Sequence, residues 1–359
     1  MEEFENNEIN RKSTTKKKKK KSKLKIFFKI LIILLVIVLI LAIGAGCGAV
    51  YIIYKKLDKI DYKENELQKV EVNEGVENTG FMNIVLFGVD SRDNKYEEHA
   101  GGDTILIVSI NNETKEVKLA SVYRDSYLSV DGKNYSKITD YFRQNGAEKT
   151  VGLLNKNLDL DISEYVTINF AVVVDVINAV GGIEMTITKA DLKYINDYIE
   201  EIRDVTGIHS KLLTKTGTYT LDGAQALAYA RIRYIGTDID RTNRQRIVLS
   251  KAFEKIKTMN VLQLNSLVDK VLPKVQTTLS PNEVIKLATG VTKYNITDSI
   301  GFPYEWADYQ PAKVYYLAPK NLEKNVTQLH KDLFGEEDYE VSAELKKISD
   351  NLIKKTGLK

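Results

Sequence analysis

The residues of this chain best suited to chemistry are arginines and aspartates in a few short stretches. Five arginines fall within 16 residues, from Arg231 to Arg246, and this stretch holds no lysine, although lysine dominates elsewhere. A guanidinium fork binds phosphate oxygens bidentately, which an ammonium group does not do. The choice of residue therefore indicates a phosphorylated ligand; a solvated basic surface is the ordinary alternative.

A second group of charged side chains borders short apolar runs. Asp90 and Arg92 follow the first run directly, Asp103 opens the second, and Arg124 closes the third. A basic cleft that also holds acidic residues favours a divalent metal ion that bridges carboxylates and a polyphosphate. The alternative is that these residues only terminate strands and face solvent.

The elements that would position this second group are buried strands. Three short runs are almost wholly apolar, as expected for strands covered on both faces: residues 83–89, 104–110 and 117–123. A turn at 111–115 joins the last two as a hairpin, so Asp103 and Arg124 lie at the same edge of the sheet. Asp90 joins them if the first strand pairs parallel to the third.

The arginine stretch spans two predicted elements. Arg231 and Arg233 are two residues apart, and in an extended segment both would point the same way. Arg241 and Arg244 begin an amphipathic helix predicted at 241–259 and share one of its faces. The N-terminal end of a helix also favours an anion.

Strands and helices alternate along much of the chain. Further predicted elements are a helix at 146–158, a strand at 166–170, an apolar helix ending at Gly181-Gly182, a strand at 183–187, and a helix after Ser280 that ends at Gly290. This interleaving, with one hairpin, predicts an α/β domain with a mixed central sheet and helices on both faces.

The N-terminus predicts a membrane anchor. Residues 30–54 carry no charge over 25 positions, and six consecutive lysines, Lys16–Lys21, precede them. As a helix this run is about 37 Å long, enough to cross a hydrocarbon core of roughly 30 Å, and it is longer than a signal-peptide core. The lysines predict a cytoplasmic N-terminus and a domain outside the cell membrane.

The same lysines and the single cysteine bear on partners and stability. Beside a membrane span, a lysine run is a topology signal, and without aromatic or groove-reading motifs we expect no nucleic acid as partner. Cys47 is the only cysteine, so no internal disulfide can form and the domain depends on a packed core.

These motifs together resemble the LytR-CpsA-Psr proteins of Gram-positive cell-envelope assembly. The matching stretches stand in the family's order across roughly residues 81–259: Gly88-Val-Asp90-Ser-Arg92, Asp103-Thr104, Val122-Tyr-Arg124-Asp125, Val180-Gly-Gly182, Leu221 to Arg233, and Asp238-x-x-Arg241-Thr-x-Arg244-Gln245. Any one of these motifs is weak, and six in order are specific.

The resemblance implies a phosphotransferase that moves a glycopolymer, teichoic acid or capsular polysaccharide, from a polyprenyl-pyrophosphate carrier to peptidoglycan. It implies Mg²⁺ (or Mn²⁺) held by Asp90 and Asp103. These two aspartates, with Arg124, Arg231 and Arg233, would form the catalytic set. The residues implied to bind pyrophosphate are Arg92, Arg124, Arg231, Arg233, Arg241, Arg244 and Gln245.

One position departs from the pattern. Many members carry an arginine two residues before the Asp of the Asp-Thr motif, and here that position is Gly101. Either Arg92 or a neighbouring arginine replaces it, or activity is impaired. The lipid tail also needs an apolar slot, which we expect between the sheet and the helix at 171–180.

Two other functions stay open. A pyrophosphatase would use the same site with water, and a non-catalytic lipid-carrier binder or regulator of envelope genes would bind without turnover. The domain organisation that we expect is a cytoplasmic tail at 1–29, an anchor at 30–54, a stalk at 55–80, a catalytic domain at 81–305 and a C-terminal helical extension at 306–359.

Overall fold

The computed structural model describes residues 61–63, 70–89 and 101–358. The predicted tail and anchor, and the candidate residues Asp90 and Arg92, lie outside these ranges. Within them, no helix has both the length and the apolar character needed to cross a membrane.

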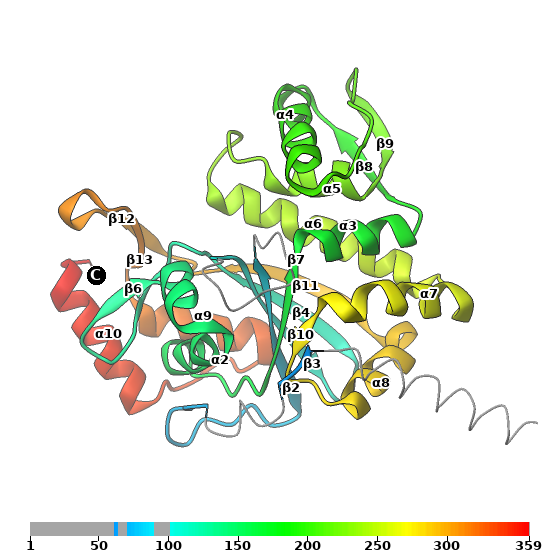
Figure 1. Cartoon of the computed structure of the whole chain (residues 1–359). Coiled ribbons are helices and arrows are strands. Elements are labelled where there is room, and N and C mark those ends of the chain that lie inside the picture. The colour runs from blue at the N-terminus through cyan, green and yellow to red at the C-terminus, as the bar shows by residue number, and fades with distance from the viewer. Residues whose placement is uncertain (1–60, 64–69, 90–100, 359) are drawn as a thin grey trace, which may run out of the picture. The chain divides into compact units, whose positions relative to one another are not determined.

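A mixed seven-stranded sheet forms the centre of the described chain (Figure 1). In spatial order its strands are β1 (Asp61–Tyr62), β10 (Gln276–Thr277), β7 (Glu164–Asn169), β2 (Phe81–Val89), β3 (Gly102–Asn111), β4 (Glu116–Val122) and β11 (Asn295–Phe302). The three apolar runs became β2, β3 and β4, which confirms the predicted α/β class with a mixed sheet.

Strand pairing brings several chain ends to one edge of this sheet. β2 pairs antiparallel with β3 and parallel with β7, while β4 pairs antiparallel with β3 and parallel with β11. The prediction brought the end of β2 to this edge on condition that β2 pairs directly with β4. That pairing does not occur, because β3 lies between the two strands. Two antiparallel pairings in succession still leave β2 and β4 running the same way. The ends of β2, β4, β7 and β11 and the start of β3 share an edge.

One face of the sheet packs against α2 (Ile138–Leu158) and shares its core with α9 (Leu322–Phe334) and α10 (Ala343–Thr356). Phe87 of β2 and Phe142 of α2 meet with ring centroids 4.8 Å apart, and each such buried side chain contributes about 1.5–3 kcal/mol. The helix predicted at 146–158 is the second half of α2, which bends at Gly146, where φ is 78°.

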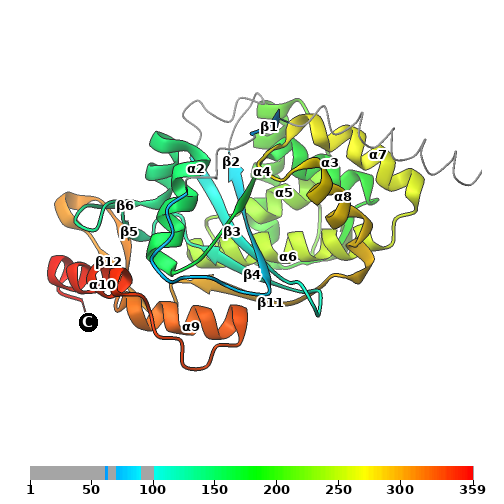
Figure 2. The ribbon, with the colours of Figure 1, turned by 90° about the horizontal axis from the view of Figure 1, so that it is seen from below.

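The opposite face is covered by α3 (Phe170–Ala179), α5 (Gly223–Arg231) and α6 (Asp238–Lys257) (Figures 1 and 2). A layer farther from the sheet holds α4 (Lys189–Thr206) and a small sheet of β8 (Ile183–Ile187) and β9 (Gly217–Leu221). The strand predicted at 183–187 exists, but within the described chain it pairs with β9 and not with the central sheet.

The remaining elements complete the described chain. They are α7 (Val261–Val271), α8 (Pro281–Thr289), β5 (Tyr127–Ser129), β6 (Tyr135–Lys137), β12 (Trp306–Tyr309), β13 (Tyr316–Pro319) and short 3-10 turns at Leu272–Lys274, Val291–Lys293 and Pro311–Lys313. α8 begins as predicted: Ser280 Oγ accepts from the Glu283 amide at 3.3 Å, and Glu283 Oε2 accepts from the Ser280 amide at 2.8 Å.

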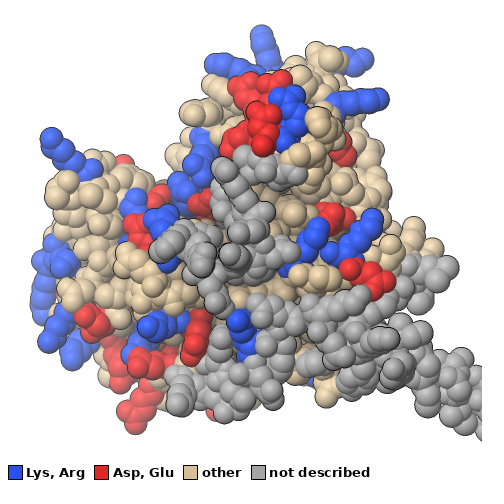
Figure 3. All heavy atoms as spheres, viewed as in Figure 1, with Lys and Arg blue, Asp and Glu red and all other residues tan. Residues whose placement is uncertain are grey.

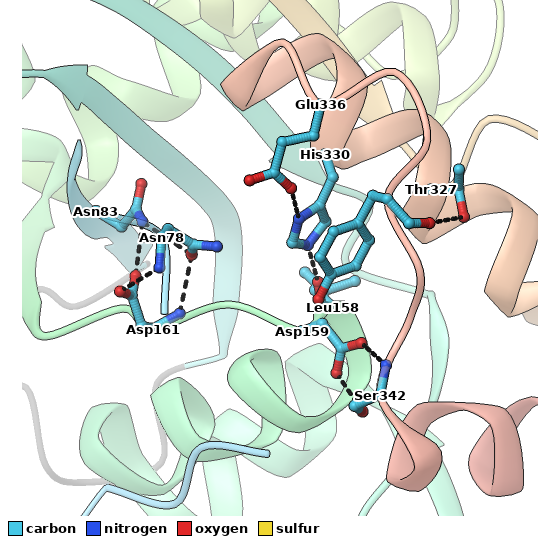
Figure 4. Close-up of polar contacts among 10 residues, drawn as sticks. Asn78, Asn83, Leu158, Asp159, Asp161, Thr327, His330, Glu336 and Ser342 are labelled. Atoms are coloured by element: carbon cyan, nitrogen blue, oxygen red, sulfur yellow. Dashed lines mark hydrogen bonds and ion pairs between the residues drawn. The ribbon is translucent and has the colours of Figure 1, made fainter. Parts of the chain in front are cut away.

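Polar contacts fix the C-terminal helices to the end of α2 (Figure 4). His330 lies 3.0 Å from the Leu158 carbonyl through Nε2 and stacks on Tyr339 with centroids 3.6 Å apart. Asp159 accepts from both the amide and the hydroxyl of Ser342 at 2.7 Å. His330 is fully buried, so it acts here as a packing residue.

Candidate functional site

The site is built around Asp103, at the start of β3. In the β2–β3 ladder Gly88 faces Thr104 and Val89 faces Gly102, so Asp103 is the extra residue of a β-bulge. A bulge turns a side chain away from the regular alternation and often does so beside active sites. The freed carboxylate accepts a hydrogen bond from Arg124 Nη1 at 2.6 Å.

Two more guanidinium groups approach the same residue. Arg233 Nη2 lies 3.7 Å from Asp103 Oδ2, and Arg241 Nη2 donates to the Asp103 backbone carbonyl at 3.4 Å. These arginines come from the end of β4, the loop after α5 and the first turn of α6. The structure therefore brings together Asp103, Arg124, Arg233 and Arg241, four of the sequence-predicted residues.

Arg231 takes a different role in the geometry. It is the last residue of α5, so Arg231 and Arg233 do not share an extended segment, and the condition under which both would point the same way is not met. Arg231 Nη2 donates to Glu201 Oε1 at 2.8 Å, and its guanidinium carbon lies 4.6 Å above the Phe170 ring centroid. This cation–π contact holds Arg231 at the wall of an apolar cavity that lies between the sheet and helices α3, α5 and α6.

Arg244 supports the loop that carries Arg233. It is largely buried and donates to the carbonyls of Ile232 at 3.4 Å and Ile235 at 3.2 Å. These two hydrogen bonds bracket Arg233 and fix the loop backbone against α6. Gln245, the next residue, lines the cavity.

An apolar cavity adjoins this cluster, between the sheet and helices α3, α5 and α6. Its empty volume, mouth included, is about 910 Å³. It lies where the sequence predicts a slot, against α3. Most of its wall is aliphatic, and its polar lining residues are Thr104, Ser121, Asn169, Arg231, Gln245 and Arg246. A ligand with a long apolar chain and an anionic head fits this combination.

Two residues of the site, Phe170 and Arg143, were not singled out from the sequence, and Arg246 was counted in the arginine stretch but was given no role. Phe170 supports Arg231, Arg246 lines the cavity, and Arg143 of α2 reaches Gly101, where a Cβ atom would lie 2.8 Å from Arg143 Nη2. A signal existed for Arg246, because it precedes Leu249 by three residues and therefore shares the cavity-facing stripe of α6. Arg143 is a tertiary contact that spacing does not reveal.

Burial shapes the electrostatics of the site. Burial lowers the pKa of the Arg246 guanidinium from its ordinary value. By contrast, Arg233 has a half-exposed side chain. On the face shown in Figure 3, basic and acidic side chains are interleaved, without one continuous patch of either sign. The positive charge around Asp103 comes from the guanidinium groups of Arg124, Arg233 and Arg241.

The described residues can be tested for a metal ion. They contain no group of three or more His, Cys, Asp and Glu side chains suited to hold one. Mg²⁺, however, keeps several waters and takes one or two protein carboxylates together with substrate phosphates. Asp103, with its side chain one-fifth exposed and next in sequence to the cavity-lining Thr104, supplies one such carboxylate and fits that mode.

The chemistry available is therefore the binding of a diphosphate on an apolar chain. Guanidinium groups can neutralise its non-bridging oxygens, and a carboxylate stands among them. A comparison with protein-family models gives the same class: residues 48–331 match the LytR_cpsA_psr family. This chain belongs to the LytR-CpsA-Psr family.

Relatives within the family carry names that describe a transfer reaction. The chain is 31% identical over 257 residues to the polyisoprenyl-teichoic acid–peptidoglycan teichoic acid transferase TagT of Bacillus subtilis (strain 168), covering 70% of this chain and 77% of TagT. It is 28% identical over 277 residues to TagU of Enterococcus faecalis, covering 74% of this chain and 86% of TagU.

A solved structure shows a lipid in a relative. The family protein YwtF (TagT) with bound octaprenyl pyrophosphate lipid superposes with a TM-score of 0.54 at 26% identity, covering 76% of this chain and 99% of that one.

Proposed function

We propose that this protein is a phosphotransferase that moves a teichoic acid or capsular polysaccharide from a polyprenyl-pyrophosphate carrier to peptidoglycan. The observation that carries the proposal is the junction of an aliphatic cavity with the cluster of Arg124, Arg233 and Arg241 around Asp103. A soluble nucleotide would not need the aliphatic wall, and a simple lipid would not need the guanidinium groups. The named activity of TagT and TagU supports the same reaction.

The reaction is a displacement at phosphorus. An acceptor hydroxyl of peptidoglycan attacks the phosphorus that carries the sugar, a new oxygen–phosphorus bond forms, and the bond to the bridging oxygen breaks. Polyprenyl phosphate leaves with that oxygen. The proton of the hydroxyl passes to a carboxylate, Asp103 or Asp90. Arg124 and Arg233 neutralise the non-bridging oxygens as charge develops on them.

The metal belongs to this proposal as a bound cofactor. Asp103 and Asp90 would hold Mg²⁺ or Mn²⁺, which would supply further positive charge at the diphosphate when bound. The protein's own contribution is orientation. Arg124 holds the Asp103 carboxylate, and Arg244 fixes the loop that bears Arg233.

The expected location follows from the N-terminus. We propose a single-pass protein of the cell membrane, anchored by residues 30–54, with the catalytic domain outside. An anchor keeps the domain close to its membrane-bound donor and raises the donor's effective concentration. A reporter fused after Lys359 is expected to be active only outside the cytoplasm, and protection of the domain from protease added to intact protoplasts would contradict this orientation.

The activity itself is tested with the full chain in lipid nanodiscs. A glycan-pyrophosphate-polyprenol donor is supplied with and without peptidoglycan, and both released polyprenyl phosphate and glycan bound to peptidoglycan are measured. Transfer predicts that both products form together and depend on the acceptor. Release without acceptor identifies a pyrophosphatase, and donor binding without release identifies a non-catalytic binder or regulator.

A further inference from the structure

Arg246 is a buried cation that the reaction described above does not use. It is 7% exposed, and its Nε and Nη1 atoms have no hydrogen-bond partner among the described residues. It lines the apolar cavity together with Val248, Leu249 and Ala252 of the same helix. These two donors of the guanidinium group have given up water without receiving acceptors in return.

This arrangement is costly for the ligand-free protein. An unpaired buried charge loses several kcal/mol of solvation, and buried guanidinium groups are ordinarily satisfied by carboxylates or carbonyls. Arg244, two residues earlier, shows that satisfied state with its two carbonyl partners. Arg246 lines the cavity, so an anion bound in the cavity is the partner that would satisfy these donors.

The position of Arg246 along α6 defines which anion. Arg241 contacts Asp103 at the polar cluster, and Arg246 lies five residues later, about 7.5 Å farther along the helix axis. Leu249 and Ala252 follow on the aliphatic wall. Arg246 is therefore intermediate between the guanidinium cluster and the aliphatic part of the cavity. The part of a lipid diphosphate found at that junction is the phosphate esterified to the chain.

We infer that Arg246 binds the lipid-side phosphate of the isoprenyl diphosphate, and that it keeps hold of this phosphate in the isoprenyl monophosphate after transfer. This inference rests on the proposed function. Arg246 then contacts the lipid-side phosphate, which is present both in the donor and in the isoprenyl monophosphate that is released. Arg124 and Arg233, by contrast, act on the phosphate that carries the sugar. Arg246 thereby sets the affinity for the leaving product.

The test compares three probes of equal chain length: farnesyl monophosphate, farnesyl diphosphate and farnesol. Their affinities are measured on the full chain in nanodiscs for the unchanged protein and for Arg246→Gln. The matched control is Arg203→Gln, since Arg203 is a partly exposed arginine of α4 that is paired with Asp204 and does not line the cavity. Because Arg246→Gln removes charge-assisted hydrogen bonds, we expect both phosphates to bind roughly 10- to 150-fold more weakly. Farnesol binding should be unchanged, and the control should match the unchanged protein.

A purely structural role for Arg246 gives a different result. It predicts a lower melting temperature for Arg246→Gln and an equal loss for all three probes, including farnesol. Our inference predicts a ligand-free melting temperature that is equal or higher, because a buried unpaired charge has been removed. Arg246→Met repeats the measurement with an apolar side chain of similar length, in case the glutamine variant folds poorly.

The outcomes separate this inference from the proposed function. Unchanged monophosphate affinity in both variants overturns the inference alone. If the unchanged protein binds neither phosphate, the inference and the proposed function both fail. If the phosphates bind, Arg246→Gln weakens them and no glycan is transferred, the inference stands and the proposed transferase activity is wrong.

Discussion

The ion pair between Asp103 and Arg124 offers the sharpest test of the site's geometry. Asp103→Asn and Arg124→Gln each remove one partner, and the double variant removes both. At 2.6 Å and an effective dielectric constant of about 20, Coulomb's law gives an attraction of about 6 kcal/mol. The two side chains are 20% and 24% exposed, so desolvation offsets part of this attraction and solvent screens another part.

The expected net coupling is that of a charge-assisted hydrogen bond, about 1.5–3 kcal/mol. Chemical denaturation gives the free energy of unfolding for all four proteins of the double-mutant cycle. The glycan-transfer assay run on the same four proteins should show that each single change costs most of the activity. The double change should be little worse, because groups that act as a unit are not additive.

Two results would refute this reasoning. Additive changes in unfolding free energy would mean that the two side chains do not interact in solution. Additive losses in transfer would mean that they serve the reaction separately. Lys274 and Asp175, paired at 2.6 Å and not among the residues that line the cavity, supply a control cycle that should show coupling in stability and little effect on transfer.

Three further predictions follow from single positions. Arg231→Lys and Arg233→Lys should each reduce transfer roughly 10- to 150-fold, nearly as much as substitution by alanine, because lysine keeps the charge and loses the two-pronged guanidinium donor. Near-normal turnover in both variants would contradict bidentate binding of phosphate by these arginines. Burial raises the pKa of Glu164 to about 7, so the folded state binds its proton more tightly and stability should fall as pH rises from about 4.5 to 7. Discounted for screening of this half-buried group, that loss is about 1–2 kcal/mol, and urea denaturation of Glu164→Gln should show a flatter pH profile. Gly223→Ala would bring a Cβ atom to 2.3 Å from the Val174 carbonyl, so separation of α3 from α5 should cost about 1–3 kcal/mol and weaken farnesyl diphosphate binding; an unchanged melting temperature would argue against this close contact.

The sequence predicted the strands of the site well because their signals are local. β2, β3 and β4 are apolar runs bounded by polar residues, and a short turn joins two of them. That pattern was enough to bring Asp103 and Arg124 to one edge. The order of the strands in the sheet could not be predicted in the same way, because it does not depend on local sequence patterns. β3 lies between β2 and β4, and the pairing of β2 depends on contacts that spacing along the chain does not encode.

The end of α5 within the arginine stretch could not be predicted from the sequence either. Nothing between Ala230 and Arg233 marks a helix end, since neither glycine nor proline stands there. At the end of α5, Arg231 makes tertiary contacts with Phe170 and Glu201, which spacing along the chain does not reveal. The bulge at Asp103 is similarly invisible in the sequence, because an apolar run that opens with glycines gives no alternation from which to read a register.

Asp103 is the extra residue of the bulge, so the regular pairing of β2 with β3 does not require it. Gly102 faces Phe142 of α2, where a Cβ atom would lie 3.2 Å from the ring, while Thr104 faces the cavity on the other side of the sheet. Gly102 and Thr104 therefore face opposite sides of the sheet, as two neighbouring residues of a regular strand do. An in-frame deletion of the single codon for Asp103 would therefore leave a regular ladder, with every other side chain of β3 on its present face. A gene of this kind is one codon away from a protein that keeps its sheet and cavity but lacks the Asp103 carboxylate.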